Sequence, residues 1–220
     1  MITLETFKRG TIALALASAF AFASNASATS VANLDTEDLA HIADAVVVGE
    51  VQGVRMAHES VSAGTAPTYR THNAIKVVET WKGTAKSGDI LDVVDIGGVV
   101  NGEGFDIEGM PGYKVGERVV LFLHRIKFAA DQWDTIGFFL GKYSLLPNTQ
   151  GGWVLTRLNW KLAERGQRLD LRSIPAIKLN VGSEDFVSFS SKVKNVVAAD
   201  KAAGIEGKRL PKYEYLGVGR

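Results

Sequence analysis

Runs of apolar residues along the chain predict short β-strands over most of its middle part. Three consecutive valines, Val46 to Val48, favour an extended backbone in the first strand. The near-continuous apolar run at 117–123 predicts a strand that is covered on both faces. Glycine, proline and polar residues between the strands predict loops at 55–67 and 97–116 and a turn at 81–83. The predicted strands are 45–54, 69–80, 89–96, 117–123, 133–139, 142–146 and 153–162.

Two further segments have the pattern of helices. A short helix is expected over 35–43, where Asp35 or Thr36 can cap the free amides and acidic residues fill the first turn. A longer amphipathic helix is expected after Ser183, with apolar residues at spacings of three and four and Gly204 as its stop. Because strands and helices do not alternate, the fold class is mostly β (α+β). We expect a curved antiparallel sheet that closes into a small barrel, with the long helix packed on it.

The N-terminal residues 1–28 have the pattern of a cleavable signal peptide. Lys8 and Arg9 precede an apolar run at 11–23, and residues 26–28 (ASA) offer the small side chains that a signal peptidase accepts. Cleavage near Ala28 would leave Thr29 first. The alternative is a membrane anchor, but a spanning helix needs about 20 apolar residues. We therefore expect a secreted or periplasmic bacterial protein with no integral membrane span after signal removal.

Composition excludes several classes of function. The 220 residues include 25 basic and 24 acidic side chains, so a net charge of +1 gives no electrostatic case for binding nucleic acid. The chain has no cysteine, which excludes disulfides, zinc–thiolate sites, iron–sulfur clusters and a cysteine nucleophile. With 46% hydrophobic residues, the chain is expected to form a packed core without them.

The sequence predicts no catalytic, cofactor-binding or metal-binding residues. The histidines at positions 41, 58, 72 and 124 lack the spacing of a zinc site and are interpreted as scattered surface residues. The acids Glu103, Asp106 and Glu108 could suggest a calcium loop, but the required spacing is absent and a solvated rim is favoured. Asp92 and Asp95 should face opposite sides of their strand.

Four segments, taken in order, carry a resemblance to a known family. They are residues 43–51 (ADAVVVGEV), 77–83 (VVETWKG), 107–123 (IEGMPGYKVGERVVLFL) and 141–143 (GKY). Together they resemble exported bacterial proteins whose fold is similar to that of tissue inhibitors of metalloproteinases and netrin-like modules. The resemblance implies an oligosaccharide/oligonucleotide-binding (OB) type barrel that binds other proteins. In the animal inhibitors an N-terminal cysteine binds the protease zinc. Here the expected first residue is Thr29, so no inhibitory residue carries over.

The leading hypothesis is therefore an exported, non-enzymatic protein-binding module of netrin-like fold, possessing no cofactor and resembling a protease inhibitor. Its partner would be another exported or cell-envelope protein. One alternative is a periplasmic hydrolase whose site assembles from His72, His124, Asp92 and Glu108. Another is a carbohydrate-binding OB-type module with Trp133 and Trp153 as a stacking platform. The expected domains are a signal peptide at 1–28, a barrel at 29–172, a C-terminal helical extension packed on the barrel at 173–207 and a polar tail at 208–220.

Overall fold

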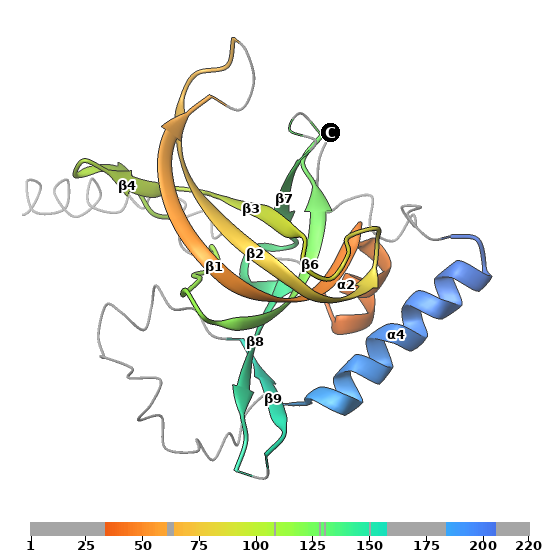
Figure 1. Ribbon diagram of the computed structural model, residues 1–220. Helices are drawn as coiled ribbons and strands as arrows, with labels where there is room; N and C mark the ends of the chain where they lie inside the picture. Colours follow the sequence, from red (N-terminus) through yellow and green to blue (C-terminus); the bar gives the residue numbers. More distant parts are fainter. Residues whose placement is uncertain are drawn as a thin grey trace, which may run out of the picture. The chain divides into compact units, whose positions relative to one another are not determined.

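The computed structural model describes residues 34–60, 64–107, 109–127, 129, 131–149, 151–157 and 184–205. This part of the chain is mostly β, with two α-helices and one 3-10 helix (Figure 1). The helices are α2 (Thr36–Ile42), η1 (Phe138–Gly141) and α4 (Phe186–Ala202). The strands are β1 (Ala45–Glu59), β2 (Thr68–Lys82), β3 (Ile90–Ile96), β4 (Gly98–Val100), β5 (Glu103–Phe105), β6 (Arg118–Arg125), β7 (Gln132–Thr135), β8 (Lys142–Pro147), β9 (Trp153–Thr156) and β10 (Glu184–Asp185).

Eight strands form one sheet in the order β1-β2-β3-β7-β6-β8-β9-β10, and β1 also pairs with β6. The pairs are antiparallel except β3–β7, which is parallel. Strand β1 therefore has two partners: Ala45–Glu50 pair with β6 on one side, and Val46–Glu59 pair with β2 on the other. Figure 1 shows β1 and β2 as a long curved ribbon.

Two glycines of β1, Gly49 and Gly53, lie at irregularities in its pairing with β2. The register with β2 shifts next to Gly49 and again before Gly53, as β-bulges do. A Cβ at Gly49 would lie 2.5 Å from Ile75 Cγ2 and 3.1 Å from the Lys76 carbonyl oxygen. A side chain there would separate the two strands, so glycine permits their close approach.

The apolar residues of the sheet divide between two clusters, one on each face. Along β1, Val46 and Val48 belong to a cluster that also contains residues of α2 and α4, whereas Val47 belongs to the other. Strand β6 divides in the same way, because Phe122 faces the helices and Leu121 the opposite cluster. The prediction that 117–123 is covered on both faces is confirmed.

Both predicted helices are present. Asp35 caps α2, and a reciprocal capping box joins its side chain and backbone to Asp38. Helix α4 is capped by Asp185, whose carboxylate accepts a hydrogen bond from the Ser188 amide. The predicted cap Ser183 lies outside the described residues. The buried face of α4 includes Phe189, which packs with Tyr143 and Phe122.

Several predicted boundaries are wrong. Residues 55–59 continue β1 instead of forming a loop, and Trp81 and Lys82 end β2 instead of forming a turn. The glycine-rich connection contains the β4–β5 hairpin. The predicted strand at 133–139 is the short β7 followed by η1.

Other predictions lie outside the described residues. These are the signal peptide at 1–28, the end of the strand predicted at 153–162, the boundary between residues 172 and 173 and the tail at 208–220. In the part that the structure describes, no helix combines the length and apolar character that a membrane-spanning helix needs.

Candidate functional site

His72 is buried, with 6% of its surface exposed, so its interpretation as a surface residue is wrong. Its Nδ1 lies 2.9 Å from Asp92 Oδ2 and its Nε2 lies 2.7 Å from Glu59 Oε1. The three residues come from adjacent strands β1, β2 and β3, which only the strand pairing brings together. Because both ring nitrogens are held by carboxylates, neither is free to accept a proton from a substrate.

Of the four residues proposed for a hydrolase site, the structure brings together His72 and Asp92. His124 instead places its Nδ1 3.3 Å from Asp44 Oδ2, and its partner across the ladder is Asp134. The hydrogen bond with His124 lowers the pKa of Asp44, which lies partly exposed. Glu108 lies outside the described residues.

The acidic residues do not gather into a cation site. Among the described residues, no group of three or more histidines and acids could hold a metal ion. Glu103 accepts a hydrogen bond from the Tyr69 hydroxyl at 3.4 Å. As predicted, Asp92 and Asp95 face opposite sides of β3, since Asp92 contacts His72 and Asp95 accepts a hydrogen bond from the Asn73 amide.

The two tryptophans proposed as a sugar platform are separated. Trp133 is buried in the cluster opposite the helices, where the Arg125 guanidinium lies 4.4 Å from its ring centroid. Trp153 is half-buried and packs against the helix-side cluster. The two rings therefore do not form one exposed surface.

The far end of the β1–β2 ribbon carries an exposed apolar surface. Among the described strands, β1 pairs here with β2 alone, and Val54, Met56 and His58 share one face because they alternate along the strand. His58 stacks on Tyr69 with ring centroids 4.4 Å apart, and Tyr69 meets the edge of Phe105 at 6.0 Å. We call the set Val54, Met56, His58, Tyr69, Val99 and Phe105 the arm surface.

The β4–β5 hairpin contributes the rest of the arm surface. The Val99 amide donates to the Met56 sulfur at 3.2 Å, which fixes the hairpin against β1. A Cβ at Gly98 would lie 3.2 Å from Met56 Cγ and 3.0 Å from Thr71 Oγ1. Gly104, at φ 151°, lies directly against the Gly98 carbonyl. The glycines thus allow the hairpin backbone to lie close to its neighbours. The side chains of Met56 and Phe105 remain 44% and 42% exposed.

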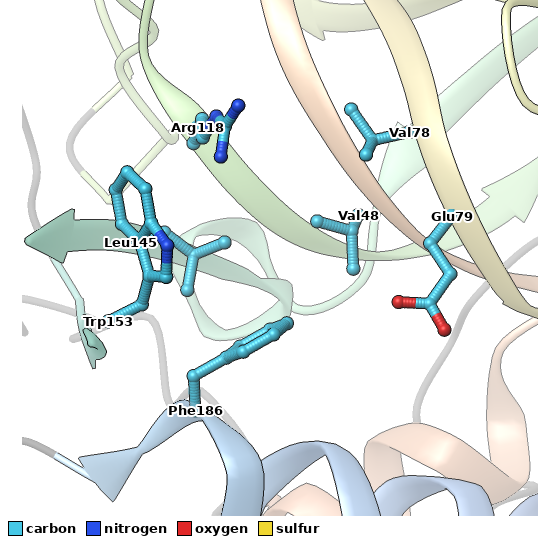
Figure 2. Close-up of a pocket in the computed structure, with 7 residues that line it drawn as sticks. All are labelled: Val48, Val78, Glu79, Arg118, Leu145, Trp153 and Phe186. Carbon is cyan, nitrogen blue, oxygen red and sulfur yellow. The ribbon is translucent and has the colours of Figure 1, made fainter. Parts of the chain in front are cut away.

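A pocket of about 130 Å³ lies where the first residue of α4 meets the strands (Figure 2). Its apolar walls come from strands distant in sequence and from α4, and a charged residue lies on each of two sides. The lining residues are Val48, Val78, Glu79, Arg118, Leu145, Trp153 and Phe186. The Arg118 guanidinium carbon lies 5.0 Å from the ring centroid of Trp153, at cation–π distance.

The opposite side of the pocket is an ion pair. Lys194 Nζ donates to Glu79 Oε1 at 2.7 Å and lies 5.4 Å from the Trp81 ring centroid. Burial raises the pKa of Glu79, but the hydrogen bond and charge of Lys194 together with the Trp81 side chain outweigh that effect, so the pKa lies below its usual value. The carboxylate is therefore ionised and already neutralised at neutral pH.

A buried ion pair between Lys142 and Glu117 also lies in the interior and was not predicted. Lys142 Nζ donates to Glu117 Oε1 at 2.6 Å, and the Ser144 hydroxyl donates to the same oxygen. Lys142 also lies 5.1 Å from the Tyr113 ring centroid. Burial lowers the pKa of Lys142, and the Glu117 charge partly offsets this effect. Ser144 is completely buried, so this serine–lysine pair is closed to a substrate.

Comparison with known proteins does not assign this chain to a family. No protein-family model matches it. No curated protein sequence matches it either.

Proposed function

We propose that the sheet is an OB-type barrel of netrin-like kind. The proposal is supported by the strand pairings, which run β1-β2-β3-β7-β6 and return from β6 to β1. It is supported also by the parallel β3–β7 pair among otherwise antiparallel neighbours. In such a barrel one bent strand serves both halves, which is the part that β1 and its glycines would play.

On that scaffold, we infer an exported, non-enzymatic module that binds another exported or cell-envelope protein through the arm surface. The observation that carries this inference is the exposure of Met56, Val99 and Phe105, of which Phe105 contacts the Tyr69 ring. Aromatic residues and methionine are enriched in protein interfaces, and contiguous exposed apolar side chains mark binding surfaces. Carboxylates hold both ring nitrogens of His72, which favours a protein-binding function over proton-transfer catalysis.

The experiment begins with affinity capture from the native secretome, using the tagged mature protein. A captured protein is then purified, and its dissociation constant is measured by calorimetry with wild type, Met56→Glu and Phe105→Glu. A charge inside a desolvated apolar contact should weaken binding about thirtyfold or more. Val115→Glu is the matched control, because Val115 is exposed but lies outside the arm surface. Equal affinities for all four proteins would refute the role of the arm.

A narrower version of this function is inhibition of a metalloprotease. A panel of zinc proteases is assayed with the mature protein in micromolar excess, and the narrower version predicts reduced turnover of at least one. Undiminished turnover of every protease in the panel would refute the hypothesis of inhibition. The calorimetry would then decide whether the module binds another protein.

A further inference from the structure

Among the described residues, one of the two charged side chains that line the pocket in Figure 2 forms no ion pair. Glu79 is already paired with Lys194. For Arg118, the structure describes no carboxylate or hydrogen-bond partner, only the stacking on Trp153. Its neighbour across the ladder is Glu50, which instead accepts a hydrogen bond from the Gln52 amide at 3.1 Å.

We propose that this pocket binds a small apolar carboxylate, with the apolar group in the cavity and the carboxylate on Arg118. A guanidinium can donate two parallel hydrogen bonds to a carboxylate, and stacking on an indole holds its plane in place before the ligand arrives. Binding here is separate from the arm surface, since the two share no residue.

The size of the cavity sets the size of the apolar group. An apolar cavity of roughly 150 Å³ accepts benzene, so a volume of about 130 Å³ suits one phenyl ring or a branched chain of about four to six carbons. Val48, Leu145 and Phe186 line this space without a polar side-chain atom. A ligand that lacks the apolar group would gain little from these walls.

The charges select an anion over a cation. Glu79 would attract an amine, but Lys194 already occupies it at 2.7 Å. Arg118 is the other charge of the lining; among the described residues it forms no ion pair, so its guanidinium can bind a carboxylate. The same chemistry occurs in a free organic acid and in the C-terminal residue of a polypeptide, such as leucine.

The test uses phenylacetate, with phenylacetamide as its neutral counterpart, followed by tryptophan fluorescence and ligand-observed NMR. We expect the purified protein to bind phenylacetate at about 1 mM, as is ordinary for a ligand of about ten non-hydrogen atoms. A second arm compares a short peptide ending in leucine with the same peptide amidated at its C-terminus. Tighter binding of the acid peptide than of phenylacetate would assign the pocket to a polypeptide C-terminus, and the reverse would assign it to a free acid.

Three variants localise the binding. Arg118→Gln should weaken phenylacetate binding about tenfold to a hundredfold, which corresponds to a lost hydrogen-bonded charge pair. Arg125→Gln is the matched control, because Arg125 also stacks on a tryptophan but lies outside the pocket. Val78→Phe, at a half-exposed lining position, should fill the cavity and abolish binding while the melting temperature stays within a few degrees of wild type.

Three results would overturn the proposal. The first is equal binding of phenylacetate and phenylacetamide. The second is no binding of any acid probe at roughly fifty times the expected constant. The third is equal weakening by Arg118→Gln and Arg125→Gln, which would place the ligand elsewhere.

Discussion

The buried ion pair between Lys142 and Glu117 allows a quantitative test of how burial changes the energy of a charge pair. The two side chains are 1% and 3% exposed, and their N···O distance is 2.6 Å. Lys142→Met would leave the Glu117 carboxylate buried with hydrogen bonds from the Ser144 hydroxyl and the Lys114 amide only. Breaking one side of such a pair costs about 3–5 kcal/mol of unfolding free energy.

The double variant Glu117→Gln/Lys142→Met should recover most of that loss. Glutamine keeps an acceptor for Ser144, and methionine keeps an apolar side chain beside Tyr113. Replacing both charges of a buried pair is often neutral whereas each single replacement is costly, so we expect a coupling free energy of at least about 3 kcal/mol from the double-mutant cycle. Urea unfolding followed by circular dichroism at neutral pH measures all four free energies.

The chain offers a matched control in the pair Lys194–Glu79. Its N···O distance is 2.7 Å, but the side chains are 47% and 46% exposed. The cycle with Glu79→Gln and Lys194→Met should therefore give a coupling below about 1 kcal/mol. Equal couplings in the two cycles would refute the reasoning, since the pairs differ mainly in burial.

Three further predictions concern single side chains. Asp35→Ala removes the cap of α2 and should lower the free energy of unfolding in urea by about 1 kcal/mol. Asp35→Asn keeps the acceptor, so an equal loss in that variant would contradict the prediction. The lowered pKa of Asp44 means that its ionised carboxylate stabilises the fold, by less than about 1 kcal/mol because the group is half-exposed. This stabilisation is fully present above the usual pKa of the carboxyl and is lost as pH falls through the lowered pKa. Thermal melts of wild type and Asp44→Asn should therefore converge on acidification, and a constant difference would contradict the role of His124. Burial raises the pKa of Tyr113 well above its usual value near 10. The stabilisation from burying its neutral hydroxyl is therefore fully present below about pH 10 and decreases as pH rises above about 10. In alkaline titration, phenolate absorbance from Tyr113 should appear only with unfolding, and Tyr113→Phe should lack that step.

The sequence predicted best those elements whose burial has a local pattern. The α2 cap at Asp35 and the near-continuous apolar run at 117–123 are local features of the sequence, and the structure confirms both predictions. Residues 55–59 were misassigned because this part of β1 is exposed or half-buried, which leaves charged and polar residues on a strand. Strand pairing with β2 alone extends this part of β1, and no local pattern reports it.

The candidate sites were harder to predict because each joins distant parts of the chain. His72 meets Glu59 and Asp92 only through the register of three strands. Lys142 and Glu117 are charged residues that a sequence pattern assigns to the surface, and their pairing across β6 and β8 is a tertiary event. The pocket takes residues from five strands and one helix, so neither spacing nor composition indicates it.

The double pairing of β1 has a consequence for how the protein acquires its structure. Strand β2, one partner of β1, follows it directly in the sequence. Strand β6, with which Ala45–Glu50 pair on the other side, is synthesised much later. During synthesis this edge of β1 stays open, with valine side chains uncovered and amides unsatisfied. Such non-local contacts slow folding, because a long loop must close before they stabilise anything. The pairing of β1 with β6 should therefore form later in folding than its pairing with β2.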